Sequence, residues 1–331
     1  MIASDTRLTV VPTPIPGESG PGYLMRAFSI NGQGWSRDQF RVSGFSIAAV
    51  VHGDLAGPVR AYLGCEGVPD CLVSPVVTGT RVALFGEELH RDDWTSRQRR
   101  WCPDCWRGDL SAAGGQRRAY WGIYRRPWWD VTAISACPTH RVRLAAHYPD
   151  CGEGVSWHYG SLTRCRNGHD LLRCEAVALD ADDCRADAYL AGRLGGAPRV
   201  ACDALDGLTL VDAVAAMERL GAAWLDENAG MARLRAELGR GALMNAGHRV
   251  AADLPRHAVS LLDRVRAGTD GRRRGWGSST PTAGCMPGSA PCRRALWHPR
   301  YARPSPATCA RACSSRPASH SKVCPGPRRS D

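Results

Sequence analysis

Apolar residues recur at helical spacing in two parts of the chain. The first twenty residues are rich in proline and polar residues, and a helical pattern then runs from Glu18 through Phe28. Residues 185–267 also show apolar side chains every three or four positions. These stretches predict an α-rich protein whose helical regions flank a central part with weaker periodicity.

The second helical region divides into three predicted helices. The first follows Thr209, a favoured N-cap residue type, with Asp212 three residues on as its capping partner. Gly221 is expected to interrupt this helix, because glycine costs about 1 kcal/mol in a helix interior. The other two helices are predicted over residues 231–243 and from Pro255 to about Gly268.

Composition narrows the class of protein. The chain has 331 residues and no apolar run close to the roughly 18 residues that a membrane helix needs. Its proline-rich N-terminus does not have the pattern of a signal peptide, so we expect a cytoplasmic protein. In that compartment the 15 cysteines are expected to be metal ligands or buried thiols rather than disulfides.

The net charge of +11 comes from the C-terminal segment alone. Residues 1–270 hold 31 arginines and 31 acidic residues, whereas residues 271–331 hold 11 arginines and one lysine against a single acid. Nine prolines and few apolar residues predict that this segment is disordered. Two interpretations remain open: a basic arm that binds nucleic acid, and a tail translated out of frame from GC-rich DNA, which we prefer.

Two matched cysteine motifs carry the clearest chemistry. Cys102 and Cys105 flank a Pro-Asp pair, and Cys137 and His140 flank a Pro-Thr pair. Three thiolates and one imidazole at such spacing make a closed tetrahedral zinc site. The alternatives are two unrelated pairs of buried thiols, and a redox Cys-x-x-Cys motif, which would normally stand in a βαβ context.

A second zinc site is predicted from a looser pattern. His147 and Cys151, with Cys165 and His169, can supply two cysteines and two histidines, and Cys174 can replace one of them. The alternative is a lobe without metal that is held together by leucine packing. With the helices on either side, the motifs predict small zinc-binding lobes of the zinc-ribbon or knuckle type between helical regions.

Arginines alternate with aromatic residues around the first motif. Arginine with aromatics suits phosphate contact and base stacking, but aromatics also fill the thin cores of small zinc lobes, and the two interpretations are about equally supported. The DNA-contact hypothesis names Arg97, Arg99, Arg100, Arg117, Arg118, Arg125 and Arg126. There is no phosphate-binding Gly-Lys-Ser/Thr loop and no convincing carboxylate constellation for strand transfer, so we do not expect an enzyme.

The order of the motifs resembles one known family. They are the opening Pro12-Thr-Pro-Ile-Pro-Gly-Glu-Ser19, the helix Tyr23-Leu-Met-Arg-Ala27, the two cysteine motifs with Tyr120-Trp121 and Trp128 or Trp129 between them, Cys151-Gly152, Cys165 and Gly168-His-Asp-Leu171. This set resembles the TniQ family, accessory proteins of DNA transposition. The chain departs from the family at Tyr148 and near Asn167, where the family usually has cysteines.

The resemblance implies a non-catalytic role. Such a protein would bind DNA or a targeting complex and link the chosen site to a transposition ATPase and a transposase. Glu18, Ser19 and Arg26 would belong to an N-terminal interaction helix. A homodimer is left open, and no membrane partner is expected.

The predicted organisation is an N-terminal helical region over 1–90, a zinc-binding domain over 91–178, a helical region over 179–270 and the tail over 271–331. Alternative functions are a zinc-containing protein–protein adaptor without DNA binding, a thiol- or zinc-dependent enzyme, and an inactive transposon fragment.

Overall fold

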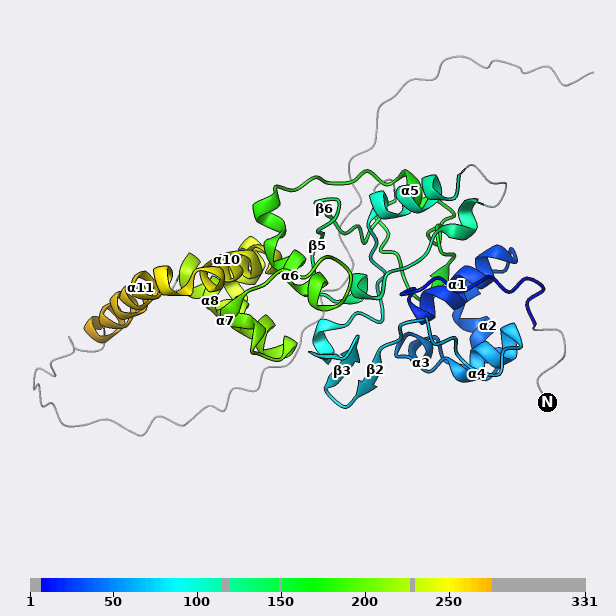
Figure 1. Ribbon diagram of the computed structural model, residues 1–331, viewed down its shortest axis with the longest axis horizontal. Coiled ribbons are helices and arrows are strands. Elements are labelled where there is room, and N and C mark those ends of the chain that lie inside the picture. The colour runs from blue at the N-terminus through cyan, green and yellow to red at the C-terminus, as the bar shows by residue number, and fades with distance from the viewer. Residues whose placement is uncertain (1–6, 115–118, 149–150, 227–229, 276–331) are drawn as a thin grey trace, which may run out of the picture. The chain divides into compact units, whose positions relative to one another are not determined.

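The computed structural model describes residues 7–114, 119–148, 151–226 and 230–275, and the fold is given for these residues only. Residue contacts divide the chain into one unit from Met1 to Ser279 and another from Thr280 to Asp331. Helices are the main element of the first unit, as predicted (Figure 1). The described part contains no helix that is long and apolar enough to cross a membrane.

The N-terminal helices pack around an aromatic cluster. Phe28 contacts Trp35, Phe40 and Tyr62, with ring centroids 5.7, 5.5 and 4.9 Å away. Trp35 also donates a hydrogen bond of 2.6 Å from Nε1 to the carbonyl of Trp157, which joins this cluster to the central region. The elements are α1 (Gly20–Ile30), β1 (Trp35–Ser36), α2 (Arg37–Val42), α3 (Ile47–Val51), α4 (Ala56–Pro58) and a turn of π-helix (Val59–Leu63).

A three-stranded antiparallel meander follows. It consists of β2 (Val76–Thr78), β3 (Arg81–Leu84) and β4 (Glu87–His90) in that order. Leu84 pairs with Glu87, so Phe85 and Gly86 form a two-residue turn with φ angles of 53° and 79°. A turn of this kind favours Asn or Gly at both positions, and Phe85 is therefore an unusual occupant.

The central region is built on tryptophans and short elements. Trp101 stacks on Trp106 at 5.8 Å, and Trp106 meets Trp129 edge-on at 5.9 Å. All three are fully buried, so the aromatics fill the core of this region as one of the two interpretations predicted. The elements are α5 (Pro103–Ala112), β5 (Ala136–Cys137), β6 (Val142–Arg143) and β7 (Tyr159–Gly160), with β5 paired to β6 and β7 to β1.

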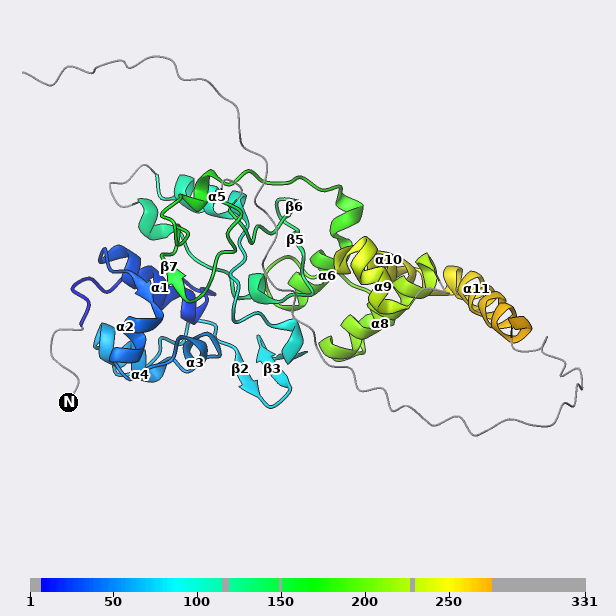
Figure 2. The same ribbon diagram turned by 180° about the vertical axis from the view of Figure 1, so that it is seen from behind.

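The C-terminal region holds the three longest helices of the described part, α8, α10 and α11. Helices α8 and α10 lie side by side in both views, and α6 packs against α10 (Figures 1 and 2). The elements are α6 (Arg185–Arg193), α7 (Asp203–Asp206), α8 (Leu210–Leu225), α9 (Met231–Leu238), α10 (Arg240–Ala252) and α11 (Leu254–Gly275). Thr209 caps α8 as predicted, since its Oγ1 accepts a hydrogen bond of 3.2 Å from the Asp212 amide.

Three of the predicted helix boundaries are wrong. Gly221 does not interrupt α8, because it lies where α8 crosses α10 and has no room for a side chain: a Cβ there would stand 2.0 Å from the Leu243 carbonyl oxygen. The helix predicted over 231–243 is broken at Gly239, where φ is 81°. Helix α11 continues to Gly275, past the predicted end and into the first residues of the predicted tail.

The rest of the predicted tail, residues 276–331, lies outside the described residues. The buried apolar cluster takes side chains from each of the three predicted regions before it, from Leu8 to Ala251. The region boundaries near residues 90, 178 and 270 stay predictions.

Candidate metal centre

The four residues of the two matched motifs come together. Cys102 is the N-cap residue of α5 and Cys105 lies in its first turn, with Pro103 at the first helical position, where proline is favoured. Cys137 ends β5, and His140 lies in the turn that leads to β6. A helix start and a strand end therefore supply two ligands each.

The distances among these ligand atoms fit one tetrahedral ion. The sulfurs of Cys105 and Cys137 are 3.7 Å apart, and Nδ1 of His140 lies 3.6, 3.3 and 3.5 Å from the sulfurs of Cys102, Cys105 and Cys137. Metal–sulfur and metal–nitrogen bonds of about 2.3 and 2.0 Å at tetrahedral angles give edges of about 3.8 Å between sulfurs and about 3.5 Å between sulfur and nitrogen. The four groups can hold a metal ion with little rearrangement.

Ionisation of the thiols also fits a bound cation. Hydrogen bonds with Cys102 and Cys105 lower the pKa of Cys137 to about 2, whereas hydrogen bonding to Cys102 raises the pKa of Cys105. Without a metal, the protons on two thiols stabilise one thiolate. A divalent cation can replace those protons and stabilise all three thiolates.

A buried carboxylate fixes the strand that carries Cys137. Asp187 of α6 accepts hydrogen bonds from the backbone amides of Ser135 and Ala136 at 2.5 and 3.0 Å. Arg141 adopts a left-handed φ of 52°, and its amide donates to the Cys137 carbonyl at 2.7 Å, which closes the turn around His140. The three cysteines are buried and the imidazole of His140 is exposed.

The second predicted site is brought together in part. Cys151, Cys165 and His169 have ligand atoms within 4.8 Å of one another. His147 is not in this group; it is exposed, and its Nε2 lies 3.1 Å from Nε2 of Gln98. The Tyr148 ring packs on His169 at 4.7 Å, in a position where the resemblance led us to expect cysteine.

The described residues thus offer three ligands in the second lobe, not the four predicted. Cys174 does not replace the missing one, because its sulfur contacts the Glu175 carbonyl at 3.7 Å and does not belong to the cluster. Leu162 and Leu171 are buried, as the alternative of a lobe held by packing expects.

Most of the predicted DNA-contacting arginines face inward. Arg99 is buried and donates to the Ser156 and Ser161 carbonyls at 2.8 and 2.6 Å, and Arg100 donates to the Ile134 and Val131 carbonyls. Burial lowers the pKa of Arg99 to about 9 and that of Arg100 to about 10. Both remain cationic at neutral pH, but their terminal N–H groups donate to carbonyls inside the protein.

Two further members of the set form internal ion pairs. Arg125 is buried against Asp130 at 2.8 Å, and Arg126 forms two hydrogen bonds to Asp109 at 2.5 and 2.7 Å. The DNA-contact prediction is therefore corrected for Arg99, Arg100, Arg125 and Arg126, which stabilise the fold. Arg97 is exposed, and Arg117 and Arg118 lie outside the described residues.

A groove is lined by further cationic side chains that were not predicted from the sequence. Arg143, His147 and Arg173 are exposed and surround a groove of about 840 Å³, in which Glu175 is the acidic residue. No ion pair of Arg143 or Arg173 occurs among the described residues. The available signal was the alternation of Val142, Arg143 and Leu144, which indicates a strand with its arginine outward.

The three residues assigned to the interaction helix, Glu18, Ser19 and Arg26, are buried. Glu18 and Arg26 form an ion pair with atoms 2.6 Å apart, and Ser19 caps α1 by accepting from the Gly22 amide at 3.3 Å. Arg26 also donates to the Trp121 carbonyl at 2.9 Å. In this structure the three residues join α1 to the central region, and their assignment to an interaction helix stays a prediction.

Comparison with known proteins agrees with the resemblance drawn from the motifs. The model of the TniQ family matches residues 70–144, a segment that contains all four ligands of the first centre. The search of curated proteins found no match. The family match indicates an accessory role in transposition. The predicted resemblance to the TniQ family is confirmed over residues 70–144, which match the model of that family.

Proposed function

We propose that this protein is a non-catalytic, zinc-stabilised adaptor that binds DNA and helps to present the target site for transposition in the cytoplasm. The observation that carries the proposal is the coincidence of the family match with the closed ligand set of Cys102, Cys105, Cys137 and His140. With all four positions supplied by the protein, the ion has a structural role.

Zinc is the metal that this donor set suits best. Three thiolates and an imidazole at tetrahedral spacing favour a borderline-soft ion without a geometric preference of its own. The second cluster offers three ligands, so a second zinc there would need a water molecule or a further residue to complete its coordination. The predicted small zinc lobes remain part of the proposal.

For DNA, we propose the groove lined by Arg143, His147 and Arg173 as the surface that contacts the phosphate backbone. Exposed guanidinium groups that form no ion pair among the described residues are free to attract phosphates, and such contacts release counterions on binding. Arg97 remains a candidate beside this groove, because its neighbour Gln98 reaches His147. Transposase, ATPase or targeting complex as protein partners are inferred from the family alone.

The metal part of the proposal is tested by Cys137→Ser in the full chain. We expect about one equivalent of tightly bound zinc to be lost, together with the folded central region, because structural zinc contributes on the order of 10 kcal/mol in small domains. Elemental analysis and near-UV circular dichroism measure the two effects. Cys202→Ser, at a buried cysteine outside both clusters, is the matched control. Unchanged metal content in Cys137→Ser would refute the site.

The DNA part is tested separately. Arg143→Gln with Arg173→Gln should weaken binding to duplex DNA of any sequence and reduce the slope of log affinity against log salt by about 2. Arg81→Gln, at an exposed arginine of β3, should leave that slope unchanged. A metal-loaded, folded parent protein that binds no duplex even at low salt would leave the protein–protein adaptor as the function.

A further inference from the structure

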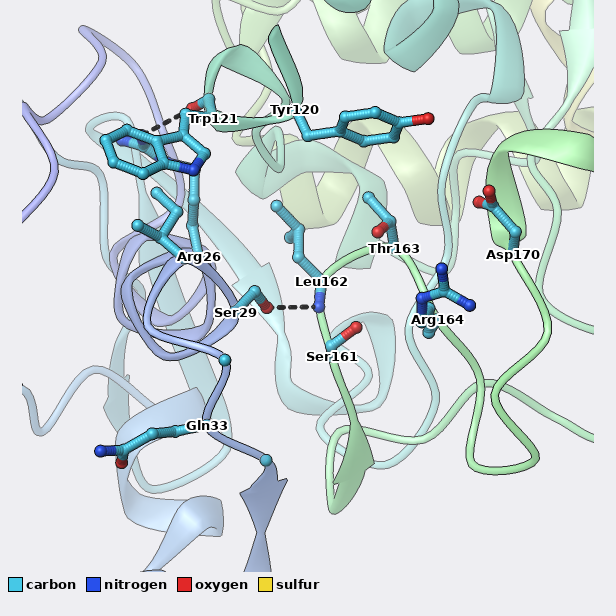
Figure 3. Close-up of a pocket in the computed structure, with 13 residues that line it drawn as sticks. Arg26, Ser29, Gln33, Tyr120, Trp121, Ser161, Leu162, Thr163, Arg164 and Asp170 are labelled. Atoms are coloured by element: carbon cyan, nitrogen blue, oxygen red, sulfur yellow. Dashed lines mark hydrogen bonds between the residues drawn. The ribbon is translucent and has the colours of Figure 1, made fainter. Parts of the chain in front are cut away.

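A cavity outside the metal centre has the chemistry of a nucleobase pocket. It has a volume of about 610 Å³ and lies where three distant segments meet: the end of α1 with the following loop, Tyr120 and Trp121, and residues 161–164 with Asp170 (Figure 3). Cavities of roughly 300–1,000 Å³ accept small ligands, so one nucleotide fits.

One wall of the cavity offers an aromatic face. Tyr120 is 57% exposed although it lies beside a cavity. Figure 3 shows its ring on the opposite side of the cavity from Leu162 and Thr163. Among the described residues no other ring is found stacked on it. The Tyr120 ring therefore offers a face on which a planar group can stack.

The end of the cavity holds one cation and one anion. Arg164 donates from one nitrogen to the Gly168 carbonyl at 2.9 Å, and among the described residues its guanidinium has no ion pair. Asp170 accepts from the Leu172 amide at 3.1 Å through Oδ1, which leaves its second oxygen. The two side chains form no ion pair with each other within 4.0 Å. A ligand can therefore bind to both.

We propose that this pocket binds an unpaired guanine base. The base would stack on Tyr120, donate its N1–H and exocyclic amino group to the Asp170 carboxylate, and accept at O6 from Arg164. Adenine and the pyrimidines do not present an acceptor beside two donors in this order. Proteins read unpaired bases by this combination of stacking and contacts to the base edge. The inference rests on the proposed function, since it adds an unpaired nucleotide to the nucleic acid that the protein binds.

Fluorescence anisotropy with short single strands tests the pocket. The probes are thymidine strands with one central guanine or one central adenine, and their uridine RNA counterparts. The metal-loaded full chain should bind the guanine strand several-fold more tightly than the adenine strand. Tyr120→Ala should weaken guanine binding about tenfold, while Tyr120→Phe retains it and Asp170→Asn abolishes the preference for guanine over adenine.

The matched control is Tyr159→Ala, at a tyrosine of β7 that is 38% exposed and outside the cavity. It should leave guanine binding unchanged. Equal binding of the guanine and adenine strands by the parent, or a Tyr120→Ala protein that binds guanine as the parent does, would overturn the inference. Tighter binding of the DNA or of the RNA strand identifies which nucleic acid supplies the base.

The two proposals fail in different ways. Loss of duplex binding in the groove variants, with the guanine preference intact, separates the groove from the pocket. A parent that binds duplex but shows no preference among single strands keeps the proposed function and removes the pocket.

Discussion

Replacing Gly247 by alanine tests how closely α8 and α10 approach. Both helices carry a glycine at their crossing, Gly221 on α8 and Gly247 on α10. A Cβ on Gly247 would stand 1.7 Å from the carbonyl oxygen of Met217 and 2.5 Å from its carbonyl carbon. Ordinary contacts between such atoms are about 3.5 Å, so the two helices would have to move apart by more than about 1 Å to make room for the Cβ.

The cost follows from what lies in the way. Overpacking a core costs about 1–3 kcal/mol when side chains can adjust, but here the obstacle is the backbone of a packed helix. We therefore expect a destabilisation at the upper end of this range, about 3 kcal/mol. Alanine offsets part of it, about 0.5–1 kcal/mol, because it lowers the conformational entropy of the unfolded chain. The net loss of about 2 kcal/mol should lower the thermal midpoint by about 4–8 °C.

The same substitution elsewhere should have the opposite sign. Gly108 lies in the interior of α5, is exposed, and a Cβ added there would meet nothing within 4 Å. Gly108→Ala should therefore raise the midpoint by a few degrees, about 0.5–1 kcal/mol of free energy. Thermal unfolding followed by far-UV circular dichroism compares the two variants with the parent. A Gly247→Ala protein as stable as the parent would show that the helices do not cross this closely.

Two further predictions concern side chains near the metal centre and in the meander. Burial raises the pKa of Asp187 to about 6, above its ordinary 3.8, so the folded state holds that proton more tightly. The stabilisation of the folded state by this protonated carboxyl is fully present below about pH 4 and is lost as the pH rises through 6, by up to about 3 kcal/mol. Asp187→Asn should remove this pH dependence of stability, which urea midpoints measured across that pH range would show. A parallel decline of the midpoints in parent and variant would contradict the prediction. Phe85→Asn should stabilise the protein by up to about 1 kcal/mol, because asparagine adopts the left-handed φ of 53° in the β3–β4 turn at lower cost than phenylalanine. A lower thermal midpoint in this variant would mean that the packing of Phe85 outweighs its backbone strain.

The first metal centre could be predicted from the sequence because its information is local. Each motif fixes the positions of two ligands within one turn of the backbone. The four ligands then form one site when the fold brings the two turns into contact. The second cluster depends on a longer loop, and there the sequence placed His147 in the set although the structure leaves it at the surface beside Gln98.

The arginines could not be sorted from the sequence, because an arginine beside aromatics looks the same whether it faces solvent or the core. Arg99 lies inside because backbone carbonyls accept its N–H groups, and Arg125 lies inside with one nitrogen donating to the Asp130 carboxylate. Those partners are between five and 63 positions away in the chain. The spacing of residues along the sequence does not predict contacts over such separations. Gly221 was misjudged for a related reason: propensity assigns a cost to glycine in a helix, whereas a close crossing requires it.

The order of the ligands along the chain has a consequence for synthesis. All four ligands of the first centre lie between Cys102 and His140, whereas Asp187, which braces the strand next to Cys137, follows 47 positions after the last ligand. A ribosome adds about 5–20 residues per second, so the ligands precede their brace by several seconds. If the proposed zinc is bound, the nascent chain can take it up before α6 docks, so that α6 would pack onto a centre that is already closed, and the zinc supply at that moment would limit how much protein folds.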